Sequence, residues 1–479
     1  SGIFFRGESM TYPGPLTDKN ICAIFTGAAD FIRRPLQCGD HTLYAYAIDG
    51  LISGADASDF VFKPITQQLR GETPEALYHQ ALAGAVYNCV ADPCEDLDAL
   101  ALKLVNGFCI VLFPGTGAVA YEVKTPEKRS ISSPTVENTV KGPKDAFVET
   151  SRSNTSLIRR HLRSPQLRIY ETQVGKKSLT NVSVIWMDGV TEPELVERMK
   201  KRLAEVEADD FISASAVEEY VTGSRVTPFP LLQFTERTDR FCHGLLGGRV
   251  GLIVDGLPLG YLAPVDIGML MDSPEDRSRD FITASCIRIL RYGALLLGLL
   301  LPGLYIAMAS FHQEMLPLQL LCSIIESKQD VPFSTTAEVL GMLIAFELLQ
   351  ESGIHLPQAI GQSVSIIGGI VVGSAGVEAK LLSPVALIVV SIAGVCGFVL
   401  PNRDFAEGIR VWRFAVAVSS ALAGLFGTAV GIILLLIHLS GLKSLDVPYL
   451  APFQNLRRSS VLRKRLDRDN YSIDRPECE

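Results

Sequence analysis

The sequence predicts an α/β region followed by an α-helical membrane domain: two small, duplicated cytoplasmic α/β subdomains and then a bundle of about four transmembrane helices. Hydrophobic residues make up 48 % of the 479 residues, and with Gly counted in place of Tyr the apolar share is about 54 %, above the roughly 45–50 % of soluble domains. Most long apolar runs follow residue 290. A formal net charge of −8 argues against a nucleic-acid partner.

The first residues contain no basic region followed by a long apolar core, so we expect no signal peptide and a soluble part that stays in the cytoplasm. None of the ten cysteines forms a Cys-x-x-Cys pair, and several lie in apolar runs. We therefore expect the cysteines to be reduced and buried, as small hydrophobic residues are.

An internal similarity predicts the duplication. A short β-rich run ends at Asp49-Gly50, and a similar run ends at Asp188-Gly189. Further along, 104–115 resembles 245–256, and the spacing from Asp to the glycine of the second anchor is 58 residues in the first half and 60 in the second. Each half should therefore contain a strand leading into an Asp-Gly turn, then helices, then a hairpin-like pair of strands.

The domain boundaries follow from composition. Residues 124–144 are rich in Ser, Thr, Pro, Lys and Glu and lack hydrophobic periodicity, which is typical of a linker. The predicted domains are a first cytoplasmic α/β subdomain over 1–128, a linker over 129–135, a second α/β subdomain over 136–275, a transmembrane domain over 276–442 and a basic cytoplasmic tail over 443–479.

Crossing about 30 Å of hydrocarbon takes about 20 apolar residues in a helix. Three runs meet this length plainly, 293–311, 382–400 and 414–439, and 359–376 is a weaker fourth because it contains glutamine, serines and several glycines. The run 340–349 is short and carries Glu347, so we expect an interfacial or re-entrant helix there.

Loop charges predict the orientation. Four arginines precede the first span and seven basic residues follow the last, so both ends should be cytoplasmic. Six acidic residues against one lysine mark 312–358 as external. Four spans then place a cytoplasmic turn near 378–380 and an external turn near 401–407. Six spans remain an alternative if 340–349 and a partner segment both insert.

We find no pattern that predicts catalysis. The seven histidines lack metal-ligand spacing, and Gly115-Thr116-Gly117 lacks the remainder of a phosphate loop, so it is interpreted as a hairpin turn. Gly247-Gly248 is interpreted as a helix C-terminal turn before a strand. We therefore expect no metal, no cofactor and no enzymatic activity.

Polar groups at the predicted membrane are the candidate functional residues, because ionisable side chains there must face protein or water. A small-residue stripe in 359–376 would pack on neighbouring helices and turn other side chains toward a pore. The structural alternatives are ordinary helix packing for 359–376, a turn pair with Lys380 for Glu378, and a solvated helix end for His312 and Glu314. The pore or gating candidates are Gln362, Val364, Ile367, Val371 and Glu378, and the external mouth candidates are His312 and Glu314.

Several motifs together closely resemble the GerA family of spore germination proteins, the A subunits of nutrient germinant receptors. The resemblance runs from about residue 20 to 455 in consistent order, with Thr238 and Phe234 as modest departures from the family pattern. The motifs include Lys141-Gly142-Pro143, Gln233-Phe234-Thr235-Glu236-Arg237-Thr238-Asp239, Arg288-Ile289-Leu290-Arg291-Tyr292, Phe311-His312-Gln313-Glu314-Met315, Ile360-Gly361-Gln362 and Val447-Pro448-Tyr449-Leu450-Ala451-Pro452.

The resemblance implies a multi-pass protein of the spore inner membrane that works with a B-type, transporter-like subunit and a C-type lipoprotein subunit. It also implies a homo-oligomeric ring, a pentamer being one arrangement, that forms a nutrient-gated cation channel. The alternatives are an amplifying channel of the stage V sporulation AF type and a non-conducting receptor scaffold. A secondary transporter would need inverted repeats, and none is visible.

Overall fold

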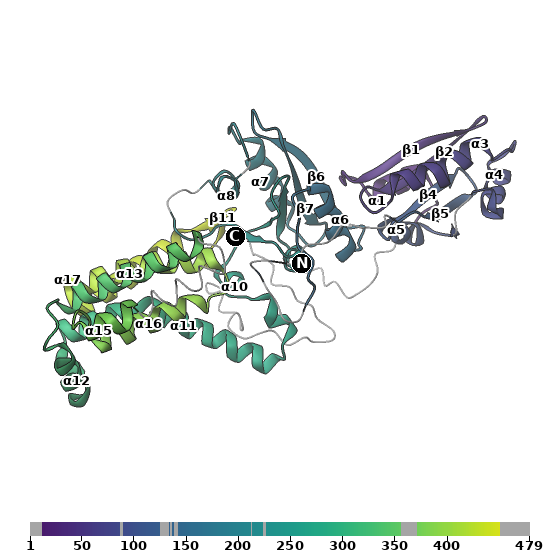
Figure 1. The fold of residues 1–479 in the computed structure, drawn as a ribbon. Coiled ribbons are helices and arrows are strands. Elements are labelled where there is room, and N and C mark those ends of the chain that lie inside the picture. The colour runs from purple at the N-terminus through teal and green to yellow at the C-terminus, as the bar shows by residue number, and fades with distance from the viewer. Residues whose placement is uncertain are drawn as a thin grey trace. The chain divides into compact units, whose positions relative to one another are not determined.

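The computed structural model describes residues 12–86, 90–124, 134, 137, 142–211, 213–223, 227–355 and 371–450, with the backbone alone for 353–355 and 371–372. The chain divides into two compact units (Figure 1). The α/β unit contains the described residues up to Gly223 together with Leu232–Pro264, and the helical unit contains 227–231 and the described residues from Val265 onward. Residues 265–275, which the sequence assigned to the second α/β subdomain, thus fold with the helices.

The first half of the α/β unit is a five-stranded antiparallel sheet in the order β1-β2-β4-β5-β3. The Thr17 hydroxyl and the Asp96 carboxylate cap the helices that follow them by accepting from backbone N–H groups. Its elements are α1 (Asp18–Ile24), β1 (Phe31–Cys38), β2 (His41–Ile48), α2 (Gly54–Ala57), η1 (Ser58–Phe62), α3 (Lys63–Gln67), α4 (Pro74–Gln80), η2 (Ala81–Ala85), β3 (Ala91–Cys94), α5 (Leu97–Val105), β4 (Phe108–Phe113) and β5 (Gly117–Glu122).

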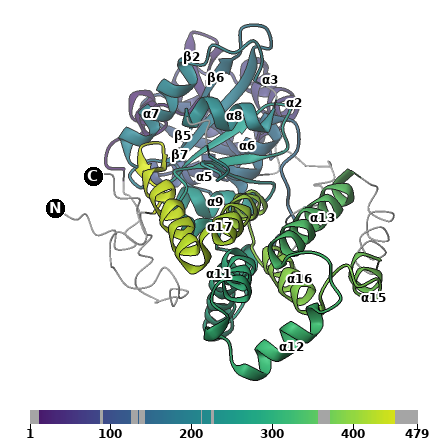
Figure 2. The ribbon, with the colours of Figure 1, turned by 90° about the vertical axis from the view of Figure 1, so that its left-hand side faces the viewer.

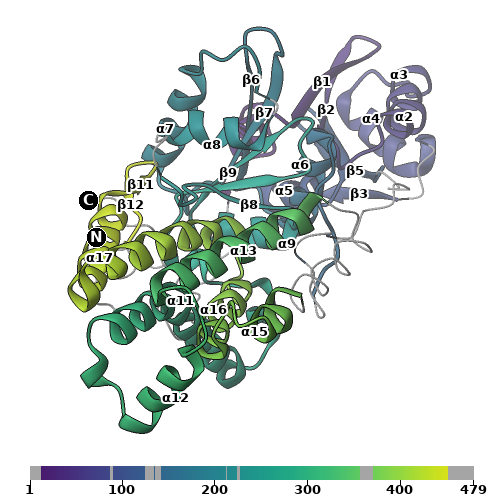
Figure 3. The same ribbon diagram turned by 60° about the vertical axis from the view of Figure 1, so that its left-hand side comes forward.

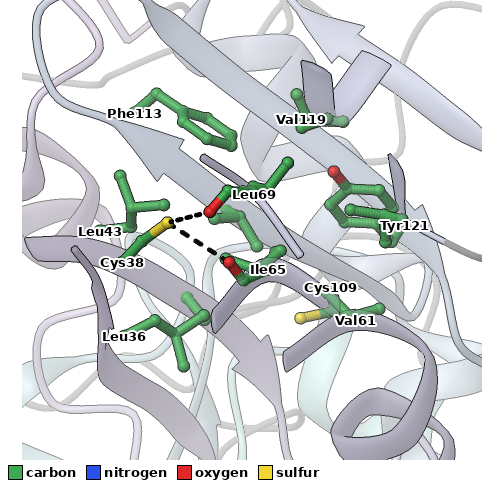
Figure 4. Close-up of a cluster of buried hydrophobic side chains, with 14 of the residues drawn as sticks. Leu36, Cys38, Leu43, Val61, Ile65, Leu69, Cys109, Phe113, Val119 and Tyr121 are labelled. Atoms are coloured by element: carbon green, nitrogen blue, oxygen red, sulfur yellow. Dashed lines mark hydrogen bonds between the residues drawn. The ribbon is translucent and has the colours of Figure 1, made fainter. Parts of the chain in front are cut away.

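Helices cover both faces of this sheet, so its central strands are apolar throughout rather than alternating. Successive side chains of β4 enter two different cores: Val111 and Phe113 pack with α2 to α4, whereas Ile110 and Leu112 pack with α1 and α5. In the first of these cores the Cys38 thiol donates to two backbone carbonyls (Figure 4). Burial raises the pKa of the Cys109 thiol to about 12.

The second half repeats the fold. Its sheet has the order β6-β7-β9-β10-β8, which matches the first sheet strand for strand. Its elements are α6 (Ser151–His161), β6 (Leu167–Val174), β7 (Thr180–Met187), α7 (Pro193–Ala204), α8 (Ala214–Thr222), β8 (Gln233–Thr235), α9 (Thr238–Leu246), β9 (Val250–Val254) and β10 (Gly260–Ala263). The predicted duplication is confirmed.

The glycine anchors that revealed the duplication have equivalent conformations. Gly50 and Gly189 have φ of 79° and 75° after β2 and β7, and Gly107 and Gly248 have φ of 84° and 82° before β4 and β9. These left-handed values favour glycine. At Gly107 an added Cβ would also lie 3.0 Å from the Leu51 carbonyl oxygen. The repeated glycines are therefore required by the turns that enter and leave the central strands.

A buried ion pair joins the two halves. Arg159 of α6 donates to Asp30 from Nε at 2.7 Å and from Nη2 at 2.9 Å, and the two side chains are 1 % and 8 % exposed. The neighbouring Ala29 N–H donates to the Ile169 carbonyl at the edge of the second sheet. Of the predicted linker 129–135, only Pro134 lies among the described residues.

The helical unit is dominated by long helices that lie alongside one another (Figure 3). Two of them, α11 and α17, contain stretches long and apolar enough to cross a membrane. Its elements are α10 (Ile267–Leu270), η3 (Pro274–Ser278), α11 (Phe281–Ser310), η4 (Gln313–Met315), α12 (Leu318–Lys328), α13 (Thr335–His355), η5 (Val371–Ala375), α15 (Gly376–Glu378), α16 (Pro384–Phe398), α17 (Arg403–Gly441), β11 (Lys443–Ser444) and β12 (Val447–Pro448).

The 39 residues of α17 form a hairpin of two helical arms rather than a single rod of about 58 Å (Figure 2). The backbone leaves helical geometry at Ala423 and Gly424, where Gly424 has φ 62° and ψ −138°. Between the two arms Ser420 Oγ lies 2.7 Å from Thr428 Oγ1, and the rings of Trp412 and His438 are 5.5 Å apart. The first arm therefore ends at 422 and the second starts at 425.

Two apolar clusters define the ends of the helical unit. The near end, where α11 begins, holds Leu400, Phe405 and Leu439, so α16 finishes there and α17 both begins and finishes there. The far end, where α11 finishes, holds Ile306 with Ile324 of α12, and it also contains the first turns of α13 and α16. Hence α11 and the first arm of α17 run from the near end to the far end, and α13, α16 and the second arm run back.

These directions correct the predicted membrane topology. The predicted span 414–439 is wrong as a single crossing, because it contains the turn at Gly424. The run 340–349 is the middle of α13, a 21-residue helix about 31 Å long, of which Met342 and Leu343 are buried against neighbouring helices and Ile344 and Leu348 are exposed. The expected bundle of four helices thus omits α13 and merges the two arms of α17 into one helix. As a consequence, 378–380 and 401–407 lie at ends opposite to those predicted.

Candidate functional site

An ionic layer of opposite charges lies between the helices of the helical unit. Arg413 donates from Nη2 to Glu347 Oε1 at 2.6 Å, and Arg410 donates from Nη1 to Glu347 Oε2 at 2.9 Å. Arg410 also donates to the side chain of Gln350. The arginines are three residues apart, so one face of the first arm of α17 presents both guanidinium groups to α13.

Arg413 is the most buried member of this layer, with 2 % of its side chain exposed. Its Nη1 donates to the Ala393 carbonyl of α16 at 3.2 Å, so one guanidinium contacts α13, α16 and α17. Its Nε has no hydrogen-bond partner within the described part of the chain. A guanidinium in such surroundings is tolerated only with a carboxylate beside it, which Glu347 provides.

The ionic layer continues toward the near end along α17. Arg410 Nη2 lies 3.3 Å from Glu407 Oε1, and the same oxygen lies 3.4 Å from Arg403 Nε. The exposure of these side chains increases along the series from Arg413 to Arg403. The charged side chains therefore form a continuous row of ion pairs from the interior of the bundle to its near end.

A second buried carboxylate, Glu338 of α13, lies at the far end. The Ser383 N–H before α16 donates to Glu338 Oε1, and Lys328 Nζ of α12 lies 3.6 Å from Oε2. Nearby, Lys380 Nζ donates to Asp330 at 2.6 Å. These contacts fix the end of α12 and the turn before α16 to the beginning of α13.

The mouth candidates lie at the far end. His312 follows α11, its Nδ1 is 3.6 Å from Glu314 Oε1, and its ring faces the turn of α17, where a Cβ added to Gly424 would lie 3.1 Å from Nε2. Glu378 is exposed at the end of α15, two residues before Lys380. Since Lys380 pairs with Asp330, Glu378 belongs to the same end as His312 and Glu314, and the predicted placement on the opposite side is wrong.

The pore candidates are described only in part. Gln362, Val364 and Ile367 lie outside the described residues, and Val371 begins η5 with its backbone alone described. Sequence reasoning missed Glu347, Arg410 and Arg413 as a site, because the span was started at 414 and Glu347 was taken as the mark of an interfacial helix. The available signal was one acid within an apolar run and two arginines at helical spacing.

An open cavity of about 380 Å³ lies between the halves of the α/β unit. Tyr12, Asn20, Arg168 and Asp188 supply much of its polar lining. Arg168 is paired with Asp188 at 3.1 Å, and the Asn20 amide donates to the Pro15 carbonyl. Because Asn20, Arg168 and Asp188 already have partners within the chain, we assign no ligand to the cavity.

A repeated α/β unit joined to a bundle of apolar helices with an interior ionic layer is the architecture of a membrane protein with a large α/β part. The chain belongs to the Bacillus/Clostridium GerA spore germination protein family, whose sequence model matches residues 19–475. The residue motifs had indicated this family, and the match confirms it.

The relatives from Bacillus subtilis (strain 168) include two membrane and spore germination proteins. Spore germination protein A1 is 34 % identical over 81 % of this chain and 81 % of its own length. The uncharacterized membrane protein YfkQ is 30 % identical over 92 % of this chain and 86 % of its own. The crystal structure of the N-terminal domain of the A subunit of the Bacillus megaterium spore germinant receptor GerK3 aligns with a TM-score of 0.40 and 22 % identity, covering 51 % of this chain and 92 % of that one.

Proposed function

We propose that this chain is the membrane subunit of a spore germinant receptor, and that it oligomerises into a nutrient-gated cation channel. Membership of the GerA family and similarity to spore germination protein A1 support the receptor role. The observation that carries the channel proposal is the buried Arg413–Glu347 pair, because ionisable groups inside a membrane bundle are retained where they face a water-filled path or a moving contact.

The helix directions support six membrane crossings. These are α11, α13, a segment that contains 359–376, α16 and the two arms of α17. The middle segment is included in the proposal because Glu347 of α13 pairs with Arg410 toward the near end, whereas Lys380 pairs with Asp330 at the far end. An even number of crossings keeps both termini on one side.

The near end is proposed to face the cytoplasm. Arg288, Arg291 and Arg403 lie there, whereas residues 311–334 at the far end contain three acidic residues and one lysine. This asymmetry follows the preference of basic residues for the cytoplasmic side. The α/β unit would then be cytoplasmic, and the location would be the spore inner membrane.

In this arrangement 359–376 lines the pore, with Gln362, Val364, Ile367 and Val371 as the pore or gating residues. Glu378 would stand at the outer mouth with His312 and Glu314. A ring of subunits, a pentamer being one arrangement, would multiply the Glu378 carboxylates into an acidic ring that attracts cations. Nutrient recognition is assigned to the B-type partner, with the C-type lipoprotein completing the complex.

Ion flux in reconstituted liposomes tests this proposal. The complex with its B-type and C-type partners should release K⁺ on addition of nutrient, and Glu378→Lys should lower the preference for cations over anions. Glu75→Lys, an exposed change in the α/β unit, serves as the matched control and should leave selectivity unchanged. A complex that passes no ions while spores carrying it germinate would instead support the non-conducting scaffold.

A further inference from the structure

The short helix α12 stands apart from the other helices of the helical unit because most of its surface is uncovered. Of its eleven residues only Ile324 is buried, within the far-end cluster. Lys328, on the same side of the helix, lies beside Glu338 of α13. One side of α12 is therefore attached to the bundle, and the Asp330–Lys380 pair holds the chain two residues after the end of α12.

A second apolar face of α12 has no cover within the described chain. Leu318 is 75 % exposed, Ile325 is 50 % exposed and Cys322 is exposed. At 100° per residue these three side chains fall within about 60° of one another. Gln319, Ser323 and Glu326 form a separate polar strip about 100° away. This pattern is that of a helix with one face for the bundle, one for an apolar medium and one for water.

The place of α12 after the long apolar helix α11 indicates that the apolar medium is lipid. α11 is about 45 Å long, which exceeds the roughly 30 Å hydrocarbon core, and α12 follows it after residues 311–317. Met315 on that link is 62 % exposed. Near α12, Ile388 of α16 is 57 % exposed and Leu381, in the turn before α16, is 48 % exposed, so other apolar side chains of the helical unit are also uncovered.

We propose that α12 lies in the lipid interface at the far end of the helical unit, with Leu318, Cys322 and Ile325 inserted below the headgroups. The proposal rests on the membrane sector proposed above. The charged residues of α12 are Glu326 and Lys328, which balance, so insertion depends on apolar contact and needs no anionic lipid. Through the Lys328–Glu338 pair this surface helix is attached to α13, which carries the ionic layer.

Depth-dependent quenching tests the proposal. A fluorophore is attached to Cys322, the other reactive cysteines being replaced by serine, and the chain is placed in phosphatidylcholine nanodiscs brominated either near the headgroups or near the chain ends. The matched control is the same label on Ser323→Cys in a Cys322→Ser background. A label on Leu434→Cys, an exposed position midway along the second arm of α17, reports the membrane sector itself.

We expect the label at 322 to be quenched at least twofold more strongly by shallow bromines than by deep ones, and more strongly than the label at 323. The label at 434 should respond to deep bromines. Quenching at 434 with none at 322 overturns the interfacial helix and leaves the membrane sector intact. Absence of quenching at both positions contradicts the membrane sector. Loss of quenching at 322 when partner subunits are added would assign the face to a protein and overturn the proposal.

Discussion

Lys380 and Asp330, fifty positions apart in the sequence, form an ion pair of 2.6 Å at the far end of the helical unit. Four crossings would have separated these residues by the whole membrane. In the proposed arrangement α13 adds one crossing between α11 and α16, which brings the two residues to the same end. The hairpin of α17 adds a second crossing after α16, so the total stays even.

Sidedness of labelling checks this arrangement. Asp330→Cys and Lys380→Cys should react with a membrane-impermeant maleimide from the same side of sealed vesicles, and Arg403→Cys from the opposite side, because 403 lies at the near end. A short bifunctional thiol reagent should also join 330 to 380 within one chain. Reaction of 330 and 380 from opposite faces would restore the four-span topology.

Removing the carboxylate of the ionic layer should destabilise the helical unit. In Glu347→Ala the Arg413 guanidinium stays buried without a counter-charge, which costs about 3–5 kcal/mol. Thermal unfolding in nanodiscs should register this as a large drop in Tm. Glu314→Ala removes an exposed carboxylate and should change stability by less than about 0.5 kcal/mol. Equal effects of the two changes would contradict a structural role for the buried pair.

The hairpin turn of α17 should depend on Gly424. Its φ of 62° and ψ of −138° are strained for any residue with a Cβ, and the added methyl would lie 2.9 Å from Phe311 Cβ. We expect Gly424→Ala to cost about 1–3 kcal/mol in unfolding measurements. Gly293→Ala is the control, because that helical glycine faces open space and alanine there should be neutral or stabilising.

The contact between the two halves of the α/β unit should depend on the Arg159–Asp30 pair. Asp30→Ala leaves a guanidinium that is 1 % exposed without its partner, and we expect a loss of about 3–5 kcal/mol. Asp59→Ala breaks the exposed Lys63–Asp59 pair and should cost less than about 1 kcal/mol. Chemical denaturation followed by circular dichroism measures both. Replacing Asp30 and Arg159 together by apolar residues should recover most of the loss.

Burial of Cys109 predicts an alkaline loss of stability. Its thiol pKa is raised from 9.0 to about 12 because burial disfavours the thiolate, so the unfolded chain loses this proton first as the pH rises. The stabilising contribution is complete below pH 9, falls by about 2 kcal/mol by pH 10.5 and is lost through pH 12. Cys109→Ala should flatten the stability profile between pH 8 and 10.5, whereas Cys322→Ala, an exposed position, should not.

Much of the α/β unit could be predicted from the sequence because its signals are local. Asp49-Gly50 and Asp188-Gly189 mark turns whose left-handed glycines must recur in both copies, and apolar runs such as 108–113 identify the buried strands. The candidate residues His312 and Glu314 could also be placed at the end of the first span. The ionic layer could not, since Glu347 and Arg413 are 66 positions apart and each is unremarkable in its own segment.

The sequence by itself determined the two halves, the linker composition, the apolar segments and the family. Tertiary structure decided the directions of the helices, the partners of the buried charges and the end at which Glu378 lies. The reason is that hydropathy reports the composition of a segment, whereas its direction depends on every turn that precedes it. A single glycine at 424 divides one apolar run into two antiparallel arms, and that turn is stabilised by side chains from both arms and from the end of α11.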